Sequence, residues 1–255
     1  MSKFGTLLLI GLIICCISLP LFAQERGIQQ NHYKVYRAKA PEQFKPIDVA
    51  LKDQFTKEPI KARLVSIDLF ANPVKKIRAS AAAAAVTSPI VNPNAHLTWY
   101  RFEKPEPAKY VVGFTNQFGQ QKWTVGNAEF LLVPTQKIEP NSSMPKEFNH
   151  FKAYRVLQGD FKPLQVQLLD QFDKEGKPVV VQVVKPAFFC NPTMKNKEPI
   201  FNEKYHLACY VIEKPEPSKV PTVGTVDQFG KRKLELGPQT LLCLPTIKNG
   251  FEPIK

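Results

Sequence analysis

The 255-residue sequence has little that would support catalysis. It has no Gly-x-Ser-x-Gly elbow, no phosphate-binding loop, no Cys-His nucleophile pair and no zinc motif. These absences exclude the familiar hydrolase, nucleotide-binding and zinc-enzyme classes. They predict a protein that is not an enzyme and uses no cofactor. A secreted enzyme, or an enzyme-associated domain with an unrecognised site, is the alternative.

The sequence also lacks a long apolar run beyond its first 22 residues, so we expect no later segment to span a membrane. The first residues are typical of a signal peptide, with Lys3, an apolar region from Leu7 to Leu19, and Ala23 before the expected cut. We expect residues 1–23 to be removed and the mature protein to be periplasmic, secreted or held at the cell surface. An uncleaved membrane anchor and a lipoprotein are the alternatives.

Acidic residues are scarce relative to basic ones. The chain has 35 Lys and Arg against 22 Asp and Glu, and removing residues 1–23 removes Lys3 and no acid, which leaves 34 against 22, or +12. This balance favours anionic envelope polymers or an acidic surface protein as partners, although scattered lysines are equally typical of a soluble surface. Nucleic acid is disfavoured, because the pattern shows no basic groove with aromatic residues for stacking. The candidate polyanion contacts lie beside proline-rich loops and in hairpin turns: Lys104, Lys109, Lys214, Lys219, Lys231 and Lys233.

Internal repetition is the strongest feature of the sequence. The pattern His-apolar-x-x-Tyr occurs four times, and about twenty residues after each copy comes Asp-Gln-Phe or Asn-Gln-Phe. A catalytic group or a metal site is normally needed once, so we interpret the repeated His and Phe residues as structural and predict no metal site. Asn116 stands where the other copies have Asp, which supports this interpretation. The repeated residues are His32, His96, His150 and His206, and Phe55, Phe118, Phe172 and Phe229.

The units alternate in detail, which indicates that a pair of units was duplicated. Units 32–76 and 96–137, joined by an inserted loop 77–95, form a predicted β-domain over 28–137. Residues 138–149 are the predicted linker, and units 150–195 and 206–248 form a second β-domain over 150–249. We expect the alanine-rich stretch from 79 to 85 to belong to the inserted loop, with room for one helical turn.

The local pattern is typical of β-strands. Residues 164–169 and 179–184 read as a hairpin, Gly119 and Gly230 suit tight turns that need positive φ, and 23 prolines oppose long helices. The fold class is therefore all-β: two tandem β-sandwich-like domains, each built from two homologous units of three to four strands. A four-bladed, propeller-like ring is the alternative.

Three cysteines remain after signal removal, namely Cys190, Cys209 and Cys243. The matching positions in the first half are apolar (Val35, Ala71, Trp99 and Val133), so we expect all of these sites to be buried. If each unit closes on itself, Cys209 pairs with Cys243. The rival disulfide joins Cys190 to Cys209 across units.

The motifs His-x-x-Cys-Tyr, Asp-Gln-Phe and Leu-Cys-x-Pro-x-x-Lys resemble the repeats of an uncharacterised group of secreted bacterial proteins, which is known only as a domain of unknown function. The resemblance covers nearly the whole mature chain and is closest around Cys209 and Cys243. It implies export and a repeat architecture but supplies no activity. An exported binding or structural module of the cell envelope is therefore the expected function.

Overall fold

The computed structural model describes residues 30–78, 86–173, 176–213 and 221–254, and every regular element among them is a β-strand. The all-β prediction is confirmed. Within this described part, no helix has the length and apolarity needed to cross a bilayer. The strands are β1 (His32–Lys39), β2 (Ile47–Lys52), β3 (Ile60–Arg78), β4 (Val86–Ser88), β5 (His96–Glu106), β6 (Tyr110–Asn116), β7 (Gly119–Lys137), β8 (His150–Gly159), β9 (Leu164–Leu169), β10 (Val179–Lys195), β11 (His206–Glu213), β12 (Thr222–Asp227) and β13 (Gly230–Pro253).

Four units of the same plan follow one another, each with two short strands and one long strand. They are β1–β3, β5–β7, β8–β10 and β11–β13, called units one to four below, and the short strand β4 follows unit one within the inserted loop. The second strand and the start of the long strand form a hairpin, such as β9 with β10, where Leu168 faces Val179. Gly119 and Gly230 have φ of 101° and 117° and begin the long strands of units two and four, as the turn chemistry predicts.

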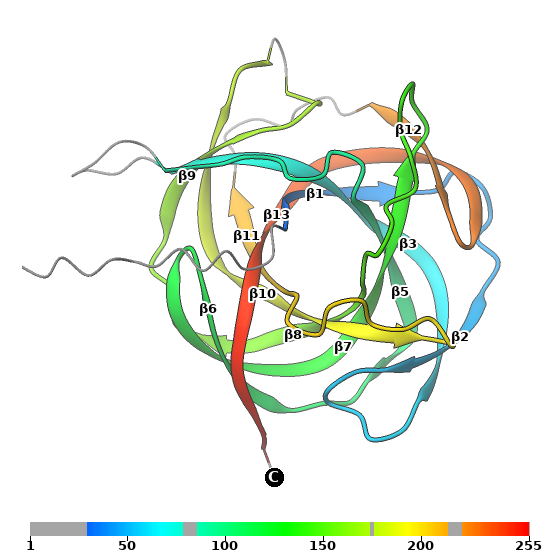
Figure 1. Ribbon diagram of the computed structural model, residues 1–255, viewed down its shortest axis with the longest axis vertical. Helices are drawn as coiled ribbons and strands as arrows, with labels where there is room; N and C mark the ends of the chain where they lie inside the picture. Colours follow the sequence, from blue (N-terminus) through cyan, green and yellow to red (C-terminus); the bar gives the residue numbers. More distant parts are fainter. Residues whose placement is uncertain (1–29, 79–85, 174–175, 214–220, 255) are drawn as a thin grey trace, which may run out of the picture.

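The first strands and the long strands pair into a closed ring, which Figure 1 shows from one end. Antiparallel pairing runs β1–β3–β5–β7–β8–β10–β11–β13 and returns to β1, where Tyr33 faces Cys243. Because the ring is closed, none of its strands is an edge strand, and open strand edges can pair with other chains and aggregate.

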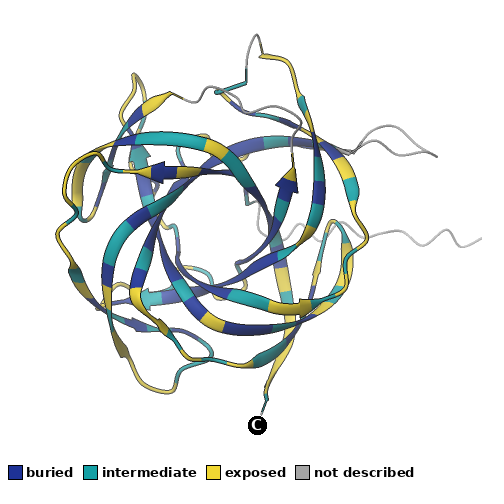
Figure 2. Ribbon diagram, turned by 180° about the vertical axis from the view of Figure 1, so that it is seen from behind, coloured by how far each residue is buried: buried dark blue, intermediate teal, exposed yellow. Residues whose placement is uncertain are grey.

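Two apolar layers result, one on each face of the ring. The inner cluster contains only ring-strand side chains such as Trp99, Phe130 and Phe188, whereas the outer cluster also contains residues of the hairpins, such as Leu51 and Phe114. The side-chain period of two places alternate residues of each ring strand on opposite faces. Buried positions accordingly follow the ring strands (Figure 2).

The two predicted halves share one sheet. Residues 138–149 do connect β7 to β8, but these strands pair directly, and β1 pairs with β13 at the other seam. Hairpin strands add further pairings between halves: β2 with β10, β9 with β3, β6 with β13 and β12 with β7. Hairpin residues pack with ring residues in the outer cluster, which is consistent with the sandwich-like prediction, and the four units surround one ring whose sheet is continuous rather than divided into propeller blades. Within the inserted loop, β4 pairs with the end of β3, and residues 79–85 lie outside the described residues.

Candidate functional site

Each Asp/Asn-Gln-Phe triplet forms the turn of its hairpin. Oδ1 of the first residue accepts a hydrogen bond from the backbone N–H of the Phe two positions later, at 2.8–3.0 Å in all four units. Asn116 makes this bond like the three aspartates, because an amide oxygen also accepts. The four Phe side chains pack against the outer cluster. The triplet therefore fixes the geometry of the turn and anchors it to the core.

The same Asp or Asn also contacts the tyrosine of the unit two places away in the ring. Burial raises the pKa of these tyrosines well above the ordinary value, so each phenol remains protonated at neutral pH. Three phenols donate to a carboxylate, and the fourth accepts from the Asn116 amide. The pairs are Tyr36–Asp170 (2.7 Å), Tyr100–Asp227 (2.5 Å), Tyr154–Asp53 (2.7 Å) and Asn116–Tyr210 (2.9 Å).

A cation accompanies each of the three buried aspartates. Lys34 Nζ lies 3.2 Å from Asp170 and 2.7 Å from Asp173, with both side chains of the first pair fully buried. Lys152 likewise lies 3.5 Å from Asp53 and 2.8 Å from Glu106. In the third cluster, Arg232 lies 3.5 Å from Asp227. Since an unpaired buried charge is strongly destabilising, these cations are part of the scaffold.

The fourth cluster has lost both charges together. Gln121 occupies the place in unit two that Arg232 occupies in unit four, five residues after Asn116 and Asp227 respectively. Gln121 donates to the Tyr210 hydroxyl at 2.7 Å, and Arg232 donates to the Tyr100 hydroxyl at 3.2 Å. The neutral pair therefore also makes two hydrogen bonds to its tyrosine, with the direction of the Asn116 bond reversed and without the charges of Asp227 and Arg232.

A second set of contacts joins each unit to the next. Each long strand carries a proline at the same place in its unit, namely Pro73, Pro134, Pro192 and Pro245. The lysine three residues after it lies over the Phe of the next triplet, with Nζ 5.2–5.5 Å from the ring centroid. The pattern runs around the whole ring and closes from unit four to unit one: Lys76–Phe118, Lys137–Phe172, Lys195–Phe229 and Lys248–Phe55.

The glutamine of each triplet lies at the same junction. His32 contacts Gln117 and His150 contacts Gln228, whereas Gln171 and Gln54 accept from Lys137 and Lys248. The repeated polar residues thus contact one another across the unit boundaries. These junctions hold the ring together in sequence order, while the Tyr–Asp contacts hold opposite units.

All four histidines are buried and neutral. The pKa of each is lowered from 6.5 to about 3, chiefly by burial and also by the positive charge of the lysine of the same unit. Each histidine belongs to a different junction, and in the described part of the chain no three His, Cys, Asp or Glu side chains come together to hold a metal ion. Both ring nitrogens of His96 are buried without a hydrogen-bond partner, and its ring stacks on Phe70 at 5.5 Å.

The predicted disulfide between Cys209 and Cys243 is confirmed. These residues face each other on β11 and β13, because the first strand of unit four does lie beside its long strand. Cys190 is free and buried, with its Sγ 3.9 Å from that of Cys209, and burial raises the pKa of its thiol. The counterpart of Cys243 in unit two is Leu132, which faces Trp99, rather than Val133.

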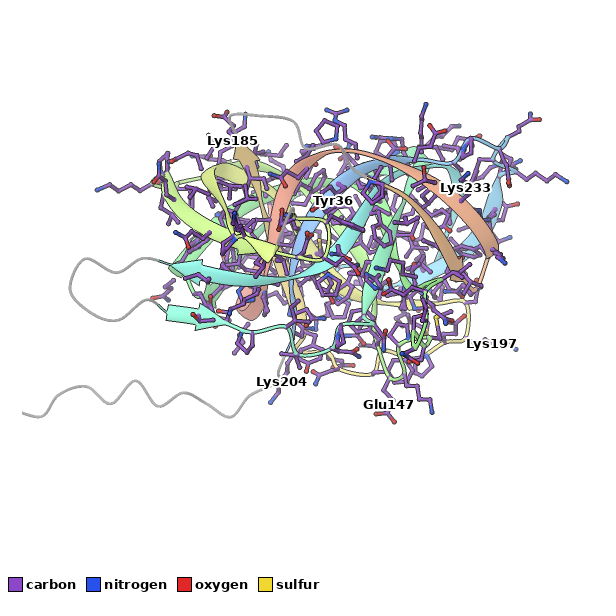
Figure 3. The ribbon with its side chains drawn as sticks, turned by 90° about the horizontal axis from the view of Figure 1, so that it is seen from above. Tyr36, Glu147, Lys185, Lys197, Lys204 and Lys233 are labelled. Atoms are coloured by element: carbon purple, nitrogen blue, oxygen red, sulfur yellow. A yellow bond between two sulfur atoms is a disulfide. The ribbon has the colours of Figure 1, made fainter. Side chains whose placement is uncertain are left out.

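The predicted polyanion contacts do not form one group. Lys104 and Lys109 flank the end of β5 and the start of β6, while Lys231 and Lys233 lie on β13; all four are exposed. Lys214 and Lys219 lie outside the described residues. Figure 3 shows further exposed lysines at both ends of the ring, with Lys185 and Lys233 toward one end and Lys197 and Lys204 toward the other.

Some residues of the junctions and of the buried clusters were not identified from the sequence. The junction lysine of unit one is Lys76, and the constant spacing of three from the proline is the signal that identifies it. Lys34 and Lys152 occupy the same place in units one and three, two residues after the histidine. Their equivalent positions indicate a common structural role, but the sequence pattern does not show that these lysines are buried beside aspartates.

The contacts described so far define a class: a closed repeat protein in which four β-units are joined by recurring side-chain junctions. The family model "Repeat of unknown function (DUF7450)" matches residues 96–245, which is more than half of the chain, and the chain belongs to this family. No curated protein and no solved structure matches. The family therefore supports the repeat architecture and leaves the function open.

Proposed function

We propose that this protein is an exported, non-catalytic binding module that holds anionic polymers at the cell envelope or outside the cell. The repeated polar residues contact one another within the ring, so the recurring motifs serve the scaffold. The carrying observation is that three buried clusters hold no excess of positive charge: Lys34 and Lys152 each face two acidic groups, and Arg232 faces Asp227. The net positive charge of the chain therefore lies outside these clusters, and exposed lysines such as Lys104 and Lys231 can attract polyanions.

Retention on immobilised heparin and on immobilised polygalacturonate tests this proposal. We expect the mature protein to bind at low ionic strength and to elute progressively as salt rises to about 1 M, where the Debye length falls to about 3 Å. Absence of retention at low salt on both resins would refute the proposal. Retention that does not respond to salt would refute its electrostatic basis.

Matched variants locate the contacts. Replacing Lys104, Lys109, Lys231 and Lys233 by Gln should lower the elution salt more than replacing four other exposed lysines, namely Lys146, Lys185, Lys197 and Lys204. Both variants lose four charges, so a difference reports position rather than net charge. Equal shifts would show that the turns have no special role.

The export part of the proposal has its own test. N-terminal sequencing of protein recovered from outside the cytoplasm should begin at Gln24. An intact Met1, or a lipid on Cys15 or Cys16, would contradict it.

A further inference from the structure

A hollow of about 360 Å³ lies between the connection from β1 to β2 and the turn from β12 to β13. Its apolar lining comes from Phe44, Pro46, Ile47 and Phe229, and its charged lining includes Lys45, Lys231 and Arg232, with Glu42 as the acidic member. The two segments lie next to each other at the right-hand edge of Figure 1, in blue and orange. The hollow therefore combines an apolar surface with three cationic groups.

The cations differ in mobility. Arg232 is held by hydrogen bonds to the Tyr100 hydroxyl at 3.2 Å and to the Phe229 carbonyl at 2.9 Å, and its guanidinium lies 5.6 Å from the centroid of Phe44. Lys45 and Lys231 are exposed on either side of the hollow. A fixed guanidinium beside two free ammonium groups is a suitable arrangement for an oxyanion.

The chain contains a second copy of the same frame with fewer cations. Phe161 of unit three packs against Tyr210 of unit four and Phe118 of unit two, as Phe44 of unit one packs against Tyr100 of unit two in the charged copy. The next residue is lysine in both copies, Lys45 and Lys162. In the turn, however, the second copy has Gln120 and Gln121 where the first has Lys231 and Arg232.

The comparison separates packing from charge. Gln121 and Arg232 both donate to the tyrosine of their cluster, so the scaffold is satisfied with or without a guanidinium. Lys231 and Gln120 are both exposed and serve no interior contact on which the fold depends. The basic character of the first copy is thus a property of its hollow rather than a requirement of the ring.

We propose that this hollow is a subsite for one acidic sugar residue, a pyranose that carries a carboxylate or a sulfate. The C–H face of the sugar packs on Phe44 and Phe229, and Lys45 and Lys231 bind the oxyanion beside the fixed Arg232. This inference rests on the proposed function and narrows it, because it assigns one place and one class of ligand. A free inorganic anion lacks the apolar face that the aromatic lining would cover.

Calorimetric titration with short oligosaccharides tests the subsite. The probes are an unsaturated heparin disaccharide, which carries sulfate, and digalacturonate, which carries only carboxylates; the better binder identifies the anion. We expect the double variant K45Q/K231Q to bind the better probe roughly tenfold more weakly, since each exposed ion pair contributes up to about fivefold. The control K162Q, in the second copy, should bind like the wild type.

A gain-of-function variant tests the same idea in the opposite direction. The triple substitution N116D/Q120K/Q121R copies the charged cluster into the second frame and should raise the stoichiometry from one to two sites per chain. Thermal unfolding of every variant verifies that the fold is intact. Equal affinities of K45Q/K231Q and K162Q, or unchanged stoichiometry in a folded triple variant, would overturn the subsite. If the subsite is overturned, retention of the wild type on the polymer resins would still support the proposed binding of polyanions. Absence of that retention would refute both the proposed function and the subsite.

Discussion

Acid should destabilise the ring through its four histidines. The pKa of each is about 3 in the folded protein and 6.5 in the unfolded chain, because burial disfavours the imidazolium. Unfolding therefore takes up protons below pH 6.5. The stability associated with neutral histidine is fully present above pH 6.5 and is lost as the pH falls toward 3.

The size of the effect follows from the linkage relation. At about pH 4.5, two pH units below the unfolded value, each histidine lowers the free energy of unfolding by about 3 kcal/mol. The four together amount to on the order of 10 kcal/mol, which is comparable to the total stability of an ordinary domain. Two carboxyl groups oppose the trend, because burial raises the pKa of Asp170 and Asp227 and their protonation becomes easier as the pH falls. Glu198, 3.7 Å from His150, also favours the protonated form of that histidine.

Urea denaturation followed by circular dichroism at pH 7.0, 5.5 and 4.5 measures this loss. The variant H96F is the sharpest probe, because His96 makes no hydrogen bond through its ring and stacks on Phe70. Its stability should fall by about 3 kcal/mol less than that of the wild type between pH 7 and pH 4.5. A wild-type protein equally stable at both pH values, or a variant with the same pH dependence as the wild type, would refute the reasoning.

Three further predictions concern the buried clusters. Lys34→Met should lower the free energy of unfolding by about 3–5 kcal/mol, because Asp170 and Asp173 lose their cation; the double variant K34M/D170N should recover part of the loss in the same denaturation assay. Asn116→Asp should lower the stability measured by thermal unfolding by roughly 1–3 kcal/mol, and adding Gln121→Arg should restore it. An Asn116→Asp variant as stable as the wild type would show that Asn116 and Gln121 do not depend on each other. Replacing Cys209 and Cys243 by Ala should lower the free energy of unfolding by about 3–4 kcal/mol. Peptide mapping of the wild type without reductant should recover Cys190 as a free thiol, and a peptide joining Cys190 to Cys209 would contradict the described pairing.

The sequence was informative wherever the responsible interaction is local. The hairpin from β9 to β10 follows from alternating valines around a polar turn, and the positive φ of Gly119 and Gly230 follows from the shortness of their turns. The disulfide between Cys209 and Cys243 could be anticipated because it joins strands of one unit. These features depend on neighbours within one repeat.

Contacts between repeats were not visible in the same way. The alternation of units suggests two separate halves, yet it is equally compatible with a ring in which opposite units match. The Tyr36–Asp170 contact joins residues in units one and three, and no local pattern specifies which tyrosine meets which aspartate. The exchange of Asp227 and Arg232 for Asn116 and Gln121 was present in the sequence. The exchange could be interpreted only once the structure showed that Asp227 lies beside Arg232 and that Asn116 and Gln121 contact the same tyrosine.

The seam between β1 and β13 imposes an order in time. The first strand of the ring, β1, pairs with the last, β13, where Tyr33 faces Cys243, so the ring cannot close until β13 has been synthesised. Until then the growing sheet has two unprotected edges, one at β1 and one at the last ring strand formed, and pairings between distant segments form slowly because their loops are costly to close. A chain interrupted before β13 therefore exposes strand edges that can join another copy, and the addition of β13 is the step that removes these edges from the ring.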